Sequence, residues 1–216
     1  MPATVDHLRA QRIRAIGVAA VAGIVALQTV AHLANTFGPR VPALDLHAER
    51  TVFSLLAAST IAALAGLCVV VGRRADVELG RARVLAALLG FLAVDEYFVI
   101  HERVGDGAVT VLRLSEGWDS VLWPLIYLPL LGVILLQLLT FARIAPPQVG
   151  TLILSGLQLL VAAVVLEVVS APFSTPATRD GLVHAVEGAL EEACEQGGWG
   201  LLVVAMLTWT TITRRR

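Results

Sequence analysis

Six long apolar stretches, separated by short polar links, constrain this chain more than any other feature of its sequence. They are Ala15–Ala34, Val52–Val71, about Ala82–Val104, Val121–Phe141, Val149–Val169, and Leu182 to about Ile212. A helix needs about 20 apolar residues to cross roughly 30 Å of hydrocarbon, whereas membrane-spanning strands are shorter and alternate in polarity. The sequence therefore predicts an all-α polytopic membrane helix bundle with six transmembrane helices, forming a single transmembrane domain over residues 1–216.

The composition points to the same surroundings. Apolar residues make up 57% of the chain and charged residues only 15%, while about a quarter of an ordinary soluble domain is charged. The net charge of −1 gives no electrostatic reason to expect a nucleic-acid partner. Two cysteines are too few for a disulfide framework or a tetrathiolate zinc site. We therefore expect membrane lipid as the main partner and no nucleic acid.

Arginine supplies all sixteen basic side chains, and its distribution predicts the orientation. Eleven of the sixteen lie at the two termini, in the second-to-third link and in the fourth-to-fifth link. Cytoplasmic segments are enriched in basic residues. We therefore expect both termini to be cytoplasmic, in a multi-pass protein of the bacterial inner membrane.

Carboxylates and imidazoles interrupt the apolar stretches almost only toward their predicted outer ends. Ionisable groups inside a membrane are costly, so a one-sided cluster of them predicts a functional site. The candidate site residues are His32, Asp45, His47, Glu49, Asp95, Glu96, His101, Glu102, Glu167, His184, Glu187, Glu191, Glu192 and Glu195.

Two stretches carry the sharpest patterns. In the last one, His184, Glu187, Glu191 and Glu195 step by three, four and four residues, which places them on one helical face. In the third, Asp95 and Glu102 are seven residues apart and also share a face. Carboxylates and imidazoles from facing helices build metal sites in bundles and suit iron, manganese or zinc. The expected ligands are Glu96, His101, Glu102, His184, Glu187 and Glu191, and the expected catalytic groups are Asp95 and Glu191.

Plainer interpretations stay open for the same residues. The start of the last stretch is also typical of a water-exposed helix, and the end of the third of an interfacial helix with arginine partners. Asp45, His47 and Glu49 lie in a link, where charged residues are ordinary, and His32 suits an interfacial position. Tryptophan and tyrosine are expected mostly in interfacial belts or in packing.

The runs LDLHAER and FLAVDEYFVIHER, followed by an acidic start to the last stretch, resemble an uncharacterised bacterial family of small six-helix integral membrane proteins. The resemblance covers about Asp45 to Glu195. It implies a six-helix topology and marks Glu49, Asp95, Glu96, His101, Glu102, Glu191 and Glu192 as motif positions. It implies no reaction.

The first functional hypothesis is a metal-dependent membrane enzyme, which hydrolyses or oxidises a lipid-like substrate near the outer leaflet. The expected cofactor is a divalent transition metal (zinc, iron or manganese) that activates bound water, and a protonated carboxyl could instead catalyse the reaction without a metal. A proton or metal-cation transporter is the second hypothesis, because buried acids often mark ion paths. A non-catalytic protein with a structural ion or a partner site is the third. The oligomeric state is not predicted.

Overall fold

The computed structural model describes residues 2–38, 41, 51–75, 77–114, 118–170 and 182–213, with no side-chain description for residues 2–6, 120 and 184. Within these ranges every regular element is a helix, which confirms the all-α prediction. The helices are α1 (Pro2–Phe37), α2 (Val52–Arg74), α3 (Leu79–Phe98), α4 (Ile100–Leu112), α5 (Asp119–Ile144), α6 (Pro147–Ser170) and α7 (Leu182–Ile212).

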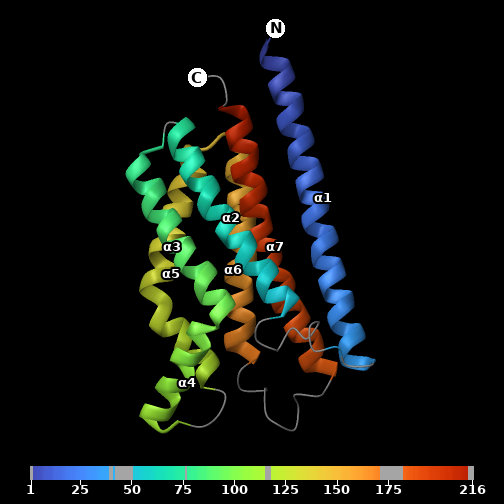
Figure 1. Cartoon of the computed structure of the whole chain (residues 1–216), viewed down its shortest axis with the longest axis vertical. Coiled ribbons are helices and arrows are strands. Elements are labelled where there is room, and N and C mark those ends of the chain that lie inside the picture. Colours follow the sequence, from blue (N-terminus) through green and yellow to red (C-terminus); the bar gives the residue numbers. More distant parts are fainter. Residues whose placement is uncertain are drawn as a thin grey trace.

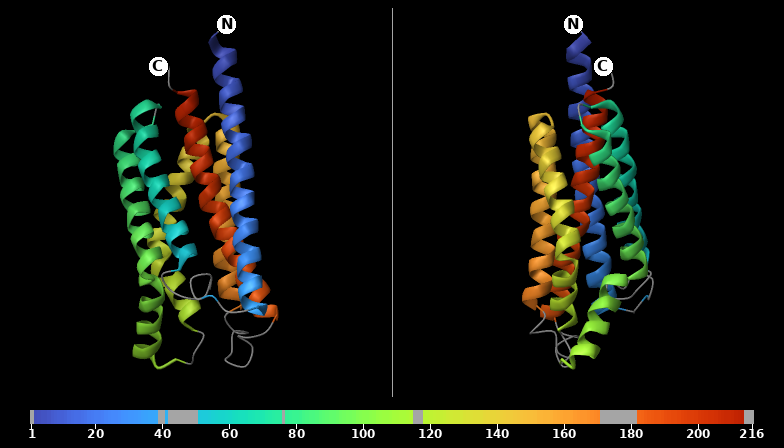
Figure 2. Two further views of the ribbon diagram at one scale, coloured as in Figure 1. Left: turned by 45° about the vertical axis from the view of Figure 1, so that its right-hand side comes forward. Right: turned by 90° about the vertical axis from the view of Figure 1, so that its left-hand side faces the viewer.

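The long helices run alternately up and down, so that both termini lie at the same end of the bundle (Figure 1). In the second view of Figure 2, α5 and α6 form one side of the bundle and α2 and α3 the other. Helix α7 lies between them and packs against α1, α2 and α6. The glutamates in the first half of α7, Glu187, Glu191, Glu192 and Glu195, are half-buried in this arrangement.

Within the part of the chain that the structure describes, four helices are long and apolar enough to cross a membrane: α1, α2, α5 and α6. The bent pair of α3 and α4 makes five if it counts as one span. These helices agree with a multi-pass membrane protein. Helix α7, which was predicted as the sixth span, is outside this set because glutamates occupy its first half.

Local sequence features explain several helix ends. Thr51 precedes α2, and its hydroxyl accepts a hydrogen bond from the Ser54 backbone N–H at 3.4 Å, as an N-cap does. Arg73 and Arg74 lie in the last turn of α2, where positive charge favours the helix dipole. Pro147 begins α6, a position that needs no backbone N–H. Together these residues set where α2 and α6 begin and where α2 ends.

The third apolar stretch is not one continuous helix, which corrects the sequence prediction. Val99 adopts a left-handed conformation, with φ 53° and ψ 46°, and separates α3 from α4. The two helices meet at 71°. A β-branched residue rarely adopts positive φ, so this break costs conformational energy that the surrounding packing must offset.

The apolar core lies in the half of the bundle nearer the termini. Leu138, Phe141, Ile153 and Leu202 are fully buried there, and Phe141 meets Trp209 edge to face. At the α6–α7 crossing, an ideal Cβ on Gly156 would lie 2.9 Å from the Gly198 carbonyl oxygen, and the reverse distance is the same. Small residues permit such backbone contact between membrane helices.

Candidate functional site

A cavity of about 490 Å³ lies among α2, α3, α4, α5, α6 and α7. Pockets of this size are typical of small-molecule sites. Eight of the predicted site residues line it: Asp95, Glu96, His101, Glu102, Glu167, Glu191, Glu192 and Glu195. The acidic residues of the third and last apolar stretches therefore face the same space.

The break at Val99 builds the central contact of this site. In a continuous helix, Asp95 and His101 would lie about 9 Å apart along the axis and about 120° apart around it. After the bend, the His101 Nδ1 lies 2.8 Å from the Asp95 Oδ2. Asp95 is only 4% exposed, so this contact is largely shielded from solvent.

Aromatic side chains of α5 complete the surroundings of this pair. The Tyr127 hydroxyl donates a hydrogen bond to the Asp95 Oδ1 at 2.8 Å. The Trp123 ring lies against the His101 ring with their centroids 4.6 Å apart, and its Nε1 donates to the Glu167 Oε1 at 2.5 Å. Helix α5 therefore links the acid of α3, the imidazole of α4 and the acid of α6.

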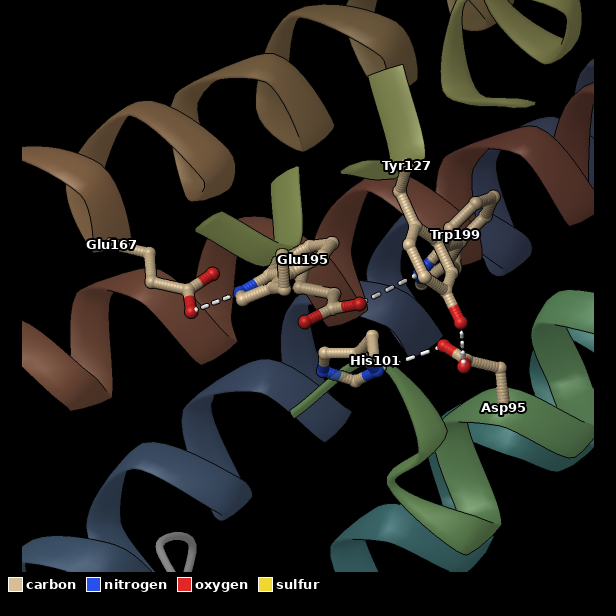
Figure 3. Close-up of polar contacts among 7 residues, drawn as sticks. Asp95, His101, Tyr127, Glu167, Glu195 and Trp199 are labelled. Atoms are coloured by element: carbon tan, nitrogen blue, oxygen red, sulfur yellow. Dashed lines mark hydrogen bonds and ion pairs between the residues drawn. The ribbon is translucent and has the colours of Figure 1, made fainter. Parts of the chain in front are cut away.

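Neutral donors also form hydrogen bonds to two acids of α7. The Trp199 Nε1 donates to the Glu195 Oε1 at 3.2 Å, and the Gln28 Nε2 of α1 donates to the Glu192 Oε2 at 3.2 Å. Figure 3 shows the Glu195 carboxylate and the His101 ring turned toward the same space, with Asp95 and Tyr127 beyond the ring. The Glu191 side chain makes no hydrogen bond to the described part of the chain and stays available for a ligand.

Other predicted site residues lie elsewhere. The buried His32 donates from its Nε2 to the Ala185 backbone carbonyl at 3.2 Å, which ties α1 to α7 away from the cavity. Glu187 is half-buried and does not line the cavity. Asp45, His47 and Glu49 lie outside the described residues, as does the side chain of His184.

The expected metal-ligand set gains no support from this arrangement. Among the described side chains, no three histidine, cysteine, aspartate or glutamate residues approach closely enough to hold a metal ion. Transition-metal sites need such convergence, since zinc, for example, takes three or four ligands at about 2.0–2.3 Å. Of the expected ligands, His101 pairs with Asp95. Tyrosine, tryptophan and glutamine donate hydrogen bonds to Asp95 and to three acids outside the expected ligand set, which are Glu167, Glu192 and Glu195.

Sequence reasoning missed those partners. Tryptophan and tyrosine were expected mostly in interfacial belts or packing, whereas Trp123, Tyr127 and Trp199 line the cavity and donate to its acids. Gln28 was not singled out. Tyr127 and Trp199 lie well inside their helices. Interfacial aromatic residues lie near helix ends, so this interior position was the sequence feature that could have indicated a role in the cavity.

A family model described as a domain of unknown function (DUF8692) matches residues 13–210 of the chain. No curated protein and no solved structure matches it. The matched range includes every residue that lines the cavity.

Proposed function

We propose that this chain, which belongs to the DUF8692 family, is an integral membrane enzyme that performs acid–base chemistry on a lipid-like substrate. The observation that carries the proposal is the Asp95–His101 pair at the wall of a largely apolar cavity. A titratable pair of this kind, beside a space that can hold an apolar ligand, is the usual composition of an active site.

His101 is the proposed general base. With its Nδ1 donating to Asp95, the Nε2 is left as the atom that accepts a proton from water or from a substrate hydroxyl. Asp95 was a candidate base from the sequence, but its bonds to His101 and Tyr127 suit a positioning role. A carboxylate placed in this way fixes the imidazole tautomer and stabilises the imidazolium.

Glu191 is the proposed partner acid. Its side chain is half-buried, lines the cavity and makes no hydrogen bond to the described residues, so it is free to give a proton to a leaving group. A base on α4 and an acid on α7 suit hydrolysis, in which one group activates water and the other protonates the leaving oxygen. Hydrolysis is therefore our first choice between the two reaction classes expected from the sequence.

The proposal includes a topology of six spans, with α3 and α4 as one broken span and α7 as the sixth. The acids of α7 exclude it from the apolar set, but α1, α2 and α6 surround it and reduce its contact with lipid. The arginine distribution favours cytoplasmic termini. In the proposed orientation the cavity is near the outer leaflet of a bacterial inner membrane.

The other hypotheses are less well supported. The described side chains do not converge as metal ligands, so we derive no step through a metal. For cation transport, the cavity would have to continue toward the termini, but the lining at that end includes Ile61, Leu138 and Leu157. Such an apolar end gives a cation no ligand.

The test is conversion of lipid by the purified, reconstituted protein. Wild-type protein and the variants His101→Gln and His7→Gln are incubated with extracted membrane lipid, and the products are measured by mass spectrometry. Loss of a general base should slow conversion by about 10²–10⁴-fold in His101→Gln. His7→Gln is the matched control, because His7 is exposed near the start of α1. Unchanged lipids with wild-type protein, or equal conversion by His101→Gln, would contradict the proposal.

A further inference from the structure

The cavity has two chemically different ends. Seven acids and one histidine line the end away from the termini, and tryptophan and tyrosine donors lie among them. The rest of the lining is aliphatic and continues along α5 from Leu128 to Leu138 and along α6 from Val165 to Leu157. Ten residues of helix cover about 15 Å. This aliphatic part is long enough for much of an alkyl chain, with its polar head among the acids.

Side chains of α5 and α6 that line the aliphatic part are also exposed at the outer surface of the bundle. Leu128 of α5 and Val161 and Val165 of α6 line the cavity, yet they are 61%, 51% and 53% exposed. In a membrane these side chains face lipid tails. A lipid can therefore enter laterally, without passing through water.

The polar side chains at this end of the cavity select the head group. No arginine is among the described residues of the lining, so an anionic head would meet carboxyl groups and a single imidazole, and no permanent cation. Burying an anion without a paired cation is strongly disfavoured. A head that donates hydrogen bonds finds free acceptor capacity instead, on Glu191 above all.

We infer that the cavity binds a lipid whose head group donates hydrogen bonds and carries no phosphate, with its chain between α5 and α6. The class comprises long-chain alcohols and amines and the hydroxyl-bearing esters of fatty acids. That such an ester is also the substrate, with water breaking its acyl C–O bond to give a fatty acid and an alcohol, rests on the proposed function, but the binding of the class does not. Gly132 provides the means to test the binding, because a Cβ built there meets nothing within 4 Å although the residue lines the cavity.

The experiment measures tryptophan quenching in phosphatidylcholine nanodiscs. Trp199 lines the cavity, and chain-brominated dodecanol, dodecylamine and dodecyl phosphate are the probes. The background variant Trp118→Phe removes an exposed tryptophan. We expect quenching by the alcohol and the amine to reach a plateau, as binding to a site does. Quenching by the phosphate should only rise in proportion to its concentration in the bilayer, without a plateau. Saturable quenching by the phosphate as strong as by the alcohol would overturn the inference.

Two leucine substitutions locate the bound chain. Gly132→Leu should raise the alcohol concentration at which quenching is half-saturated by at least about tenfold, which is equivalent to about 1.4 kcal/mol of binding free energy. Gly66→Leu is the control, because Gly66 also has open space at its Cβ but does not line the cavity. Val161→Phe narrows the lateral opening and gives a second variant if Gly132→Leu misfolds. Quenching that neither cavity variant reduces would refute the assigned position.

His101→Gln separates this inference from the proposed function. The variant should keep saturable quenching and lose lipid conversion. If His101→Gln keeps saturable quenching and still converts lipid, the catalytic role of His101 is refuted but the ligand class is not. Conversion that depends on His101, without saturable quenching by the alcohol or the amine, would refute the ligand class alone.

Discussion

The hydrogen bond from Tyr127 to Asp95 gives the sharpest test of how the site is held together. Tyr127→Phe removes only the hydroxyl, which lies 2.8 Å from the Asp95 Oδ1, and keeps the ring that contacts Phe91 and Trp123. Both partners are buried, with Tyr127 8% and Asp95 4% exposed. Water therefore cannot readily replace the lost donor.

The size of the effect follows from the charge of the acceptor. A hydrogen bond to a charged group contributes about 1.5–3 kcal/mol, and a bond between neutral groups about 0.5–1.5 kcal/mol. Tyr127→Phe should therefore lower the free energy of unfolding by about 1.5–3 kcal/mol. In an Asp95→Asn background the acceptor is neutral, and the same change should cost about 0.5–1.5 kcal/mol. The double-mutant cycle thus predicts a coupling of about 1 kcal/mol or more.

The free energy of unfolding is measured for the wild type, the two single variants and the double variant. Each protein is unfolded at equilibrium in mixed detergent micelles by titration with dodecyl sulfate, and tryptophan fluorescence follows the transition. Tyr97→Phe is the matched control, because the Tyr97 hydroxyl makes no hydrogen bond to the described residues. Its change should stay within about 0.5 kcal/mol. Equal costs for Tyr127→Phe and Tyr97→Phe, or equal costs of Tyr127→Phe in the two backgrounds, would refute the reasoning.

Three further predictions concern other parts of the site and the bundle. Trp123→Phe keeps a ring beside His101 but removes the donor to Glu167, and it should cost about 1.5–3 kcal/mol in the same unfolding assay; an unchanged midpoint would count against that bond. Gly156→Val should cost about 1–3 kcal/mol or more, because its Cβ would press on the Gly198 carbonyl, whereas Gly66→Val meets open space and should cost less. Chelation by EDTA should leave lipid conversion unchanged, and an activity lost on chelation and restored by zinc would show that ligands beyond the described residues complete a metal site.

Most helix positions followed from the sequence because long apolar stretches form helices in a membrane. The predicted stretch from Leu182 to about Ile212 coincides with α7, and Val52–Val71 lies within α2. Whether the acids of the third and last stretches meet was left open by the sequence, and residues of both stretches line the one cavity. Helical spacing places residues on a face, and the cost of exposing acids to lipid turns that face inward.

The pairing of Asp95 with His101 could not be predicted in the same way. It depends on a left-handed valine, a conformation for which valine carries no sequence signal. The donors are also distant in sequence from the acids that they bind. Tyr127 is 32 residues from Asp95, Trp123 is 44 residues from Glu167, and Gln28 is 164 residues from Glu192. Such pairings arise from tertiary packing, which a periodic pattern in one segment does not contain.

Gly156 and Gly198 also set how closely α6 and α7 approach each other. A Cβ on either glycine would lie 2.9 Å from the carbonyl oxygen of the other, so a larger residue there would separate or tilt the two helices. Glu167 lies eleven residues beyond Gly156, a lever of about 16 Å, so a tilt of about 4° moves its carboxylate by about 1 Å. A shift of that size changes reaction rates by as much as about 10²-fold. A pair of glycines deep in the apolar core thus governs how accurately distant polar groups are aimed.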